Sequence, residues 1–156
     1  MEAKPGVIEA LNAVLTADLT AINQYFLAAE MCRNWGYGRL HEKYRELSMA
    51  EMQDAQELIR HILFLEGLPN VQRLGTVRVG ETVEEQLRLG LDQEHLVIDA
   101  LNRTIELTAG AADYMTRNLV EAMVRDEAEH VDWLETQMET IRQTGLENYL
   151  GHQIRE

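Results

Sequence analysis

The sequence predicts an all-α protein, a four-helix bundle with a long crossover between its second and third helices and a short C-terminal fifth helix. Apolar residues recur at alternating spacings of three and four along four segments, as on the core-facing side of a helix. The chain contains only two prolines and few runs of β-branched residues, which disfavours a sheet. With 156 residues it is long enough for one domain, residues 1–156, with a substantial core.

The first half of the chain supplies two helices, over roughly residues 5–34 and 40–66. Pro5 suits a first helical turn, and Gly36 and Gly38 permit the turn between the helices. The core-facing residues of the first helix would be Ile8, Leu11, Leu15, Asp18, Ile22, Tyr25 and Ala29. Those of the second would be Tyr44, Ser48, Glu51, Ala55, Leu58, Ile62 and Leu65. One acid therefore interrupts each apolar stripe.

The second half repeats this arrangement after a segment without helical periodicity that ends near Gly80 and is long enough to cross a bundle. Thr82 and Glu85 resemble an N-cap and its capping-box partner, and they open a helix over 83–110. Its core-facing residues would be Leu87, Leu91, Glu94, Ile98, Leu101, Ile105 and Thr108. A helix over 113–144 follows the break at Gly110, and a short helix over 146–153 ends the chain. The stripe of the fourth helix is Val120, Val124, Glu127, Val131, Leu134, Met138 and Ile141.

The four acids form a repeat. Asp18 and Glu51 are 33 residues apart, as are Glu94 and Glu127, and potential ligands follow at Asp54 and His130. A buried carboxylate costs several kcal/mol unless it is neutralised, paired or bound to a metal. Pairing with Arg or Lys is the alternative, but no basic residue lies on the four stripes. The pattern is that of ferritin-like carboxylate proteins, in which such ligands hold two iron or manganese ions. The simplest alternative to a metal protein is a helical oligomer without metal.

Composition narrows the possible partners and compartments. Fourteen Lys and Arg against 27 Asp and Glu give a net charge of −13, which argues against nucleic acid and anionic membrane. Cys32 is the only cysteine, and no run of 18 apolar residues or signal-peptide core is present, so we expect a cytoplasmic protein. The first two helices carry a second apolar patch that predicts a subunit interface. Its residues are Leu19, Phe26, Met49, Met52, Ile59 and Leu63.

Several strings resemble the bacterioferritins over essentially the whole chain. They are AINQYF at 21–26, ILFLEGLPN at 62–70 after Arg60, DWLET at 132–136 and GLENYL at 145–150. The resemblance implies a hollow 24-subunit cage of dimers that stores ferric mineral. It also implies a di-iron ferroxidase site in each subunit, which oxidises Fe(II) with O2 or H2O2, and haem b at the dimer two-fold axis.

The resemblance assigns the metal ligands to Asp18, Glu51, Asp54, Glu94, Glu127 and His130, of which Glu51, Glu94, Glu127 and His130 carry the catalytic role. Glu51 and Glu127 would bridge the two irons, while Glu94 and His130 complete one of them. The other iron is normally completed by a Glu and a His at the positions of Asp18 and Asp54. Asp18 is one methylene shorter, and Asp54 replaces a neutral nitrogen by an anionic oxygen. We therefore expect a cation site that is weakened as a ferroxidase.

Met52 matches the methionine that binds haem iron from each subunit of the dimer, and Leu68, Pro69 and Glu81 resemble the docking surface for a small iron-sulfur ferredoxin. Two hypotheses follow. The first is an iron-storage ferroxidase. The second is a haem-bearing subunit with an impaired centre that serves electron transfer and co-assembles with a ferroxidase-active bacterioferritin chain. Tyr25 and Trp133 either lie near the metal site, as the resemblance implies, or are core aromatics.

Overall fold

The computed structural model describes residues 1–154 and confirms the all-α prediction. Its helices are α1 (Val7–Trp35), α2 (Gly38–Phe64), α3 (Val83–Gly110), α4 (Tyr114–Thr144) and α5 (Leu146–Gly151). Within the described residues no helix is both long enough and apolar enough to pass through a lipid bilayer.

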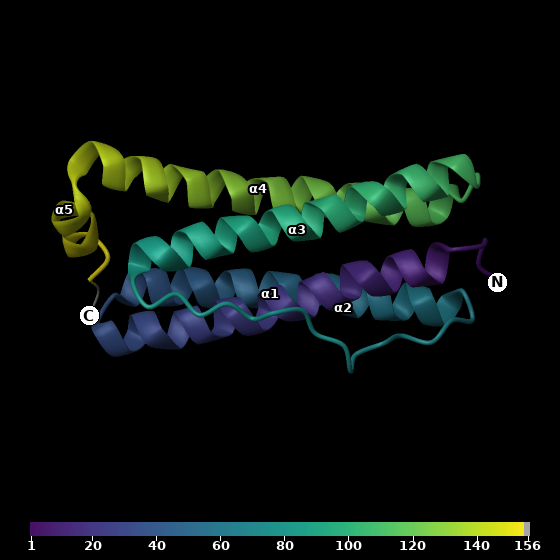
Figure 1. Ribbon diagram of the computed structural model, residues 1–156, viewed down its shortest axis with the longest axis horizontal. Coiled ribbons are helices and arrows are strands. Elements are labelled where there is room, and N and C mark those ends of the chain that lie inside the picture. Colours follow the sequence, from purple (N-terminus) through teal and green to yellow (C-terminus); the bar gives the residue numbers. More distant parts are fainter. Residues whose placement is uncertain (155–156) are drawn as a thin grey trace.

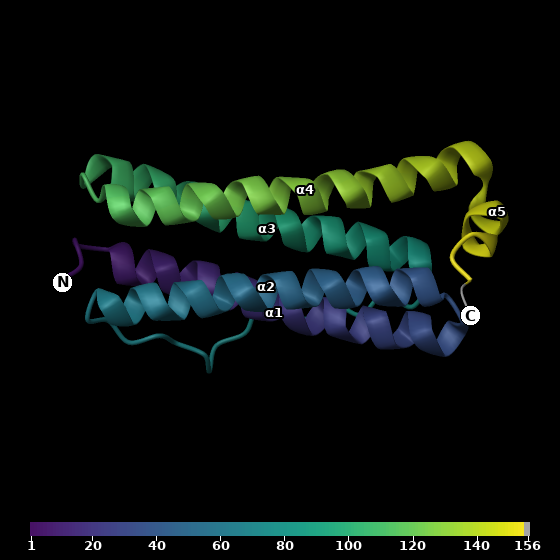
Figure 2. The same ribbon diagram turned by 180° about the vertical axis from the view of Figure 1, so that it is seen from behind.

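The four long helices lie side by side, and the crossover runs along their length (Figure 1). Helix α2 runs antiparallel to α1, and the crossover then returns the chain so that α3 begins at the same end of the bundle as α2. Helix α4 runs back along α3, and α5 covers the end of the bundle that is opposite to the N-terminus. Seen from behind, the same two hairpins, α1 with α2 and α3 with α4, make up the bundle (Figure 2). Helix α1 also contacts α3, which joins the hairpins.

Local backbone chemistry sets the helix ends. Helix α1 begins at Val7, two residues after Pro5, because Gly6 precedes it in the left-handed conformation with φ 81°. Helix α2 already begins at Gly38. Helix α3 begins at the predicted residue, where the Thr82 hydroxyl accepts a hydrogen bond from the Glu85 backbone N–H at 3.2 Å. Capping groups therefore explain the start of α3, and a glycine conformation explains the start of α1.

The acids divide the core into two apolar clusters. One cluster contains residues of α1 up to Ile22 and of α2 from Ala55, and the other contains residues of α1 from Ala21 and of α2 up to Leu47. The buried apolar residues of α3 and α4 are likewise shared between the two clusters, with Glu94 and Glu127 at the boundary. The layer of acids thus lies between two packed apolar regions, which fix the four backbones around it.

Polar side chains of α1 hold the crossover against the bundle. The Thr20 hydroxyl accepts a hydrogen bond from the Gly75 N–H at 2.9 Å, and the Gln24 carboxamide oxygen accepts one from the Arg78 N–H at 3.2 Å. Both side chains are buried, so the crossover covers part of α1 that would otherwise expose polar groups. These two hydrogen bonds hold the crossover along α1.

Candidate metal centre

Four predicted ligands converge in the acid layer. Glu51 of α2, Glu94 of α3 and Glu127 of α4 are fully buried, and His130 of α4 is partly buried, with 14% of its side chain exposed. One ligand atom from each residue lies within 4.8 Å of the others. His130 Nδ1 lies 3.1 Å from Glu51 Oε1, 3.3 Å from Glu127 Oε2 and 3.4 Å from Glu94 Oε1. Such a convergence is the donor arrangement that a divalent metal ion requires.

Most carboxylate oxygens of this layer lack hydrogen-bond donors. Both oxygens of Asp18, both of Glu127 and one oxygen each of Glu51 and Glu94 are buried without a partner. Buried polar atoms are normally paired, and buried charges are normally neutralised or bound to metal. Among the residues that the structure describes, the ion pairs of this layer involve His130 alone as the basic group. The unpartnered oxygens therefore fit metal ions.

The pKa values in the layer reflect this crowding of acids. Burial raises the pKa of Asp18 and Glu51 well above their usual values, and neighbouring carboxylates add to the effect. Burial likewise raises the pKa of Glu127 to about 8. Burial opposes ionisation of Glu94 too, but its interactions with the neighbouring Glu127 and His130 side chains bring its pKa below the usual value. A bound cation would stabilise the charged form of all these groups.

The pKa of His130 is raised, although burial alone would lower it. Burial disfavours the charged imidazolium, yet the close carboxylates of Glu127 and Glu94 raise the pKa of His130 to about 10. In the absence of metal the imidazole is therefore protonated at neutral pH and partly neutralises the acids. Metal binding requires the neutral ring, so a metal ion at His130 would take the place of this proton.

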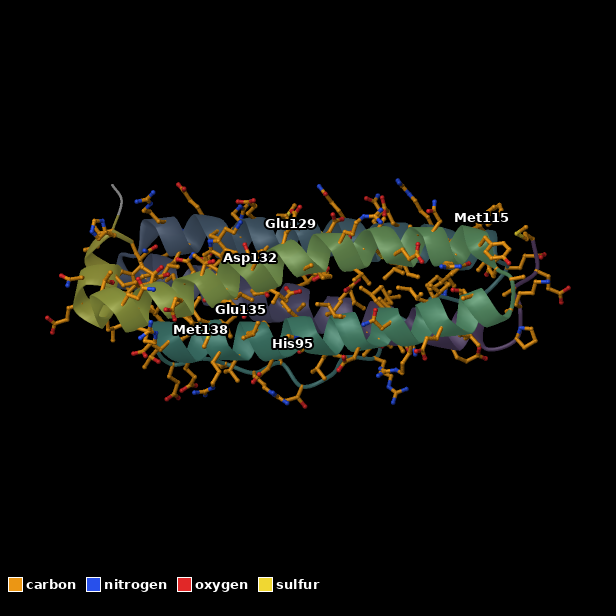
Figure 3. The ribbon with its side chains drawn as sticks, turned by 90° about the horizontal axis from the view of Figure 1, so that it is seen from above. His95, Met115, Glu129, Asp132, Glu135 and Met138 are labelled. Atoms are coloured by element: carbon orange, nitrogen blue, oxygen red, sulfur yellow. The ribbon has the colours of Figure 1, made fainter. Side chains whose placement is uncertain are left out.

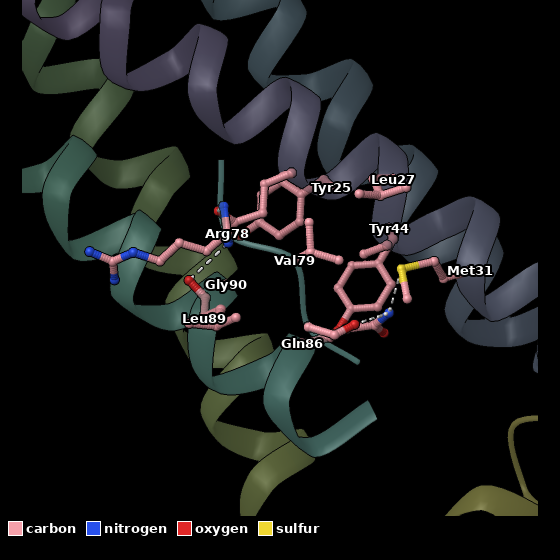
Figure 4. Close-up of a pocket in the computed structure, with 12 residues that line it drawn as sticks. Tyr25, Leu27, Met31, Tyr44, Arg78, Val79, Gln86, Leu89 and Gly90 are labelled. Carbon is pink, nitrogen blue, oxygen red and sulfur yellow. Dashed lines mark hydrogen bonds between the residues drawn. The ribbon is translucent and has the colours of Figure 1, made fainter. Parts of the chain in front are cut away.

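Tyr25 supports the centre from α1. Its hydroxyl donates a hydrogen bond to Glu94 Oε1 at 2.5 Å, and the side chain is almost completely buried. Gly90 lies one turn before Glu94, and a Cβ there would meet Tyr25 Cε1 at 3.4 Å. Figure 4 shows Tyr25 and Gly90 beside a cavity of about 10 Å³ that Tyr44 also lines. The hydrogen bond to Glu94 gives Tyr25 a role at the centre. Trp133 instead packs edge-on against Tyr44, with ring centroids 6.0 Å apart.

Asp18 and Asp54 lie beside the four-residue group rather than within it. Asp18 is 1% exposed, and its charge interacts with those of Glu127 and Asp54. Asp54 is half-buried, and burial raises its pKa to about 6. Their role as metal ligands stays a prediction.

The predicted haem and docking residues lie on the surface. Met52 is 49% exposed on α2, and Phe26, Met49 and Leu63 are also exposed apolar side chains. The exposure of these side chains agrees with the apolar patch predicted on α1 and α2. Leu68 is exposed at the start of the crossover, and Glu81 is exposed at its end.

Other polar groups near the acid layer point away from it. His95 follows Glu94 but is exposed on α3, and Glu129 precedes His130 but is exposed on α4 (Figure 3). Adjacent residues on a helix differ by about 100° in direction, which explains why only one member of each pair reaches the centre. Glu129 therefore serves as a matched control for Glu127.

The fold and the carboxylate–histidine group together define a ferritin-like protein, and the family model described as a ferritin-like domain matches residues 8–144. The chain is 44% identical over 149 residues to the bacterioferritin of Mycolicibacterium paratuberculosis, covering 96% of this chain and 94% of that protein. It is 44% identical to the bacterioferritin of Streptomyces coelicolor over 156 residues, covering 100% and 93%. It is 38% identical to that of Brucella melitensis over 149 residues, covering 96% and 92%. The chain belongs to the bacterioferritin family, which supports a function in iron storage.

Proposed function

We propose that the protein stores iron by oxidising Fe(II) at the centre formed by Glu51, Glu94, Glu127 and His130. Asp18 and Asp54 assist in binding the ions, and the ferric product enters the cavity of a 24-subunit cytoplasmic cage. The observation that carries the proposal is the set of buried carboxylate oxygens without donors, gathered around one histidine. Bacterioferritins are generally oligomeric cages, and the exposed apolar patch on α1 and α2 provides a surface for assembly.

The chain's residues bind, charge-balance and orient the substrate. Each ferrous ion loses one electron, and two such electrons with two protons reduce O2 to H2O2 or reduce H2O2 to two water molecules. Oxidation adds positive charge at the centre, and the ionised carboxylates stabilise that charge. The hydrogen bond from Tyr25 fixes Glu94 in position, while the surrounding apolar clusters limit access of water.

The test compares Fe(II) oxidation by the purified protein with that by Glu127→Ala, followed by the absorbance of the ferric product. Glu127→Ala removes two of the unpartnered oxygens, so oxidation is expected to fall to the uncatalysed rate. Glu129→Ala is the matched control, because this neighbour is exposed and should leave oxidation unchanged. Equal rates for the protein and Glu127→Ala would overturn the catalytic part of the proposal.

A second candidate function is a haem-bearing subunit that serves electron transfer and co-assembles with a ferroxidase-active bacterioferritin chain. It is favoured by the placement of Asp18 and Asp54 outside the four-residue group, while Met52 lies exposed on an apolar surface. On this proposal haem b binds at that surface, where two Met52 thioethers would hold it across a dimer. Haem with two thioether ligands supplies electron transfer and leaves no open position for oxygen. A small iron-sulfur ferredoxin that docks near Leu68, Pro69 and Glu81 would supply the electrons.

Two measurements test this second function. Met52→Leu should abolish the haem absorption band while the cage still assembles, and Met49→Leu, a change at a neighbouring exposed methionine, should retain it. Retention of the band in Met52→Leu contradicts the haem assignment. Native mass spectrometry of cages from the source cell should show two kinds of chain, and cages of this chain alone would count against co-assembly.

A further inference from the structure

We infer that the two metal positions of the centre differ in kind. The position at Glu94 and His130 takes iron tightly, whereas the position at Asp18 and Asp54 is an all-oxygen site that takes hard divalent cations such as Mn²⁺ or Mg²⁺ and exchanges them readily. The inference rests on the proposed function, and it adds the metal preference of each position. It depends on three properties of the residues in the layer: their donor atoms, their charges and their exposure.

The supply of nitrogen donors is unequal. His130 is the only imidazole that the structure brings to the acid layer within the described residues. His41 Nδ1 lies 2.9 Å from the Ala29 carbonyl oxygen, and His61 Nε2 lies 2.7 Å from Thr116 Oγ1. His95 is exposed on α3 and His152 follows α5, so neither can complete a second position. Only one metal ion can therefore have a nitrogen ligand from this chain.

Oxygen donors remain for the other position. Asp18 is 1% exposed, and neither of its oxygens has a hydrogen-bond donor, so its carboxylate lacks the partner that a buried acid requires. Its charge interacts with those of Glu127, Asp54 and Glu94. Glu51 and Glu127 also have unpartnered oxygens that both positions can share. A site built from carboxylate and water oxygen suits Mg²⁺, Ca²⁺ and Mn²⁺, whereas imidazole favours iron, cobalt and zinc.

Charge and exposure determine how firmly each ion is held. Three carboxylates converge on the one imidazole, and two more, Asp18 and Asp54, lie beside that group. After the first divalent ion binds, enough negative charge remains to attract a second, but the two ions then repel one another. Asp54 is half-buried, in contrast to the fully buried Glu94, so water reaches the second position and favours exchange. We expect the second ion of an imidazole-preferring metal to bind about tenfold or more weakly than the first.

Cobalt(II) is the probe that distinguishes the positions, because its visible absorption reports ligands without redox chemistry. The metal-free protein is titrated anaerobically with Co²⁺, with and without millimolar Mg²⁺. One equivalent per subunit should bind tightly in both conditions, and a second should bind weakly and be displaced by Mg²⁺. After loading with one equivalent of Co²⁺, Mn²⁺ followed by electron paramagnetic resonance should bind at one per subunit.

A variant with a nitrogen donor at residue 54 tests whether the donor atoms determine the metal preference of the second position. Asp54→His should bind two tight equivalents of Co²⁺ that Mg²⁺ no longer displaces, whereas Asp54→Asn, which removes the charge without adding a ligand, should keep only the first. Two equal, Mg²⁺-resistant equivalents in the unmodified protein would overturn the inference, and so would Asp54→His binding like the unmodified protein. Failure of Mn²⁺ to bind beside Co²⁺ would overturn it too, even if Asp54→His did not fold. These results leave the oxidation test with Glu127→Ala untouched, whereas absence of any Co²⁺ binding would overturn both proposals.

Discussion

Replacing Glu127 by glutamine should stabilise the metal-free protein although it removes the activity. Glu127 is fully buried, and neither of its carboxylate oxygens has a hydrogen-bond donor. Glutamine has nearly the same shape, carries no charge, and can donate its amide hydrogens to the oxygens of Glu51 and Glu94. Removal of a buried charge without an adequate partner commonly stabilises a protein, whereas removal of a metal ligand destroys the site.

The magnitude follows from the pKa of Glu127, which rises from 4.5 to about 8 on folding. Because the carboxyl pKa is raised on folding, the contribution of Glu127 to the free energy of unfolding is fully present below pH 4.5. That contribution is lost as the pH rises to about 8. At pH 7 this difference destabilises the folded protein by about 3 kcal/mol. Because neighbouring acids share protons, we expect Glu127→Gln to recover roughly 1–3 kcal/mol of that free energy. For a chain of this size the melting temperature should rise by roughly 3–10 °C.

The assay is thermal unfolding of the metal-free protein and of Glu127→Gln at equal concentration, between pH 5 and pH 8. The difference in melting temperature should grow with pH, because only the unmodified protein has the titrating carboxyl group. Glu129→Gln, on the exposed side of the same helix, should change the stability by less than about 0.5 kcal/mol. A melting temperature for Glu127→Gln that is equal to or below that of the unmodified protein at pH 8 would refute the reasoning.

Two further predictions concern the supporting residues. Tyr25→Phe removes the hydrogen bond to Glu94 Oε1 and should slow Fe(II) oxidation. It should also weaken the binding free energy of the first Co²⁺ equivalent by about 1.5–3 kcal/mol. An unchanged Co²⁺ affinity would contradict this role of Tyr25. Thr82→Ala removes the side-chain cap of α3 and should lower the free energy of unfolding by about 1 kcal/mol without affecting the rate of oxidation. Chemical denaturation measures the second effect, and a loss of oxidation would show that the cap also supports the centre.

The sequence predicts the bundle well because periodicity and capping act locally. Thr82 fixes the start of α3 through a hydrogen bond to a backbone N–H only three residues away, so the sequence alone locates it. Helix α1 begins two residues after Pro5, because the left-handed conformation of Gly6 overrides the preference of proline for a first turn. The contacts of the crossover could not be predicted, because Thr20 and Gln24 bond to backbone groups more than 50 residues away in a segment without periodicity.

The three central acids could be predicted because each interrupts an apolar stripe at a repeated spacing, and His130 because it follows Glu127 by one helical turn. The sequence leaves open whether Tyr25 lies near the metal site or only packs in the core, and its hydrogen bond to Glu94 decides for the first alternative. Two signals point to it: Tyr25 lies seven residues after Asp18 on the same face, and Gly90 leaves space one turn before Glu94. The spacing also grouped Asp54 with His130, yet the structure places only His130 among the converging atoms.

The position of the acid layer explains how the chain keeps these groups together without metal. On either side of the layer an apolar cluster joins residues of all four long helices, so the backbones cannot separate far enough to relieve the repulsion between carboxylates. Burial of those clusters stabilises the fold, and the protonated His130 offsets part of the charge. The unfavourable electrostatic energy that remains is released when cations bind. A centre held in this way is suited to metal ions, because the fold, and not the ions, determines where the carboxylates lie.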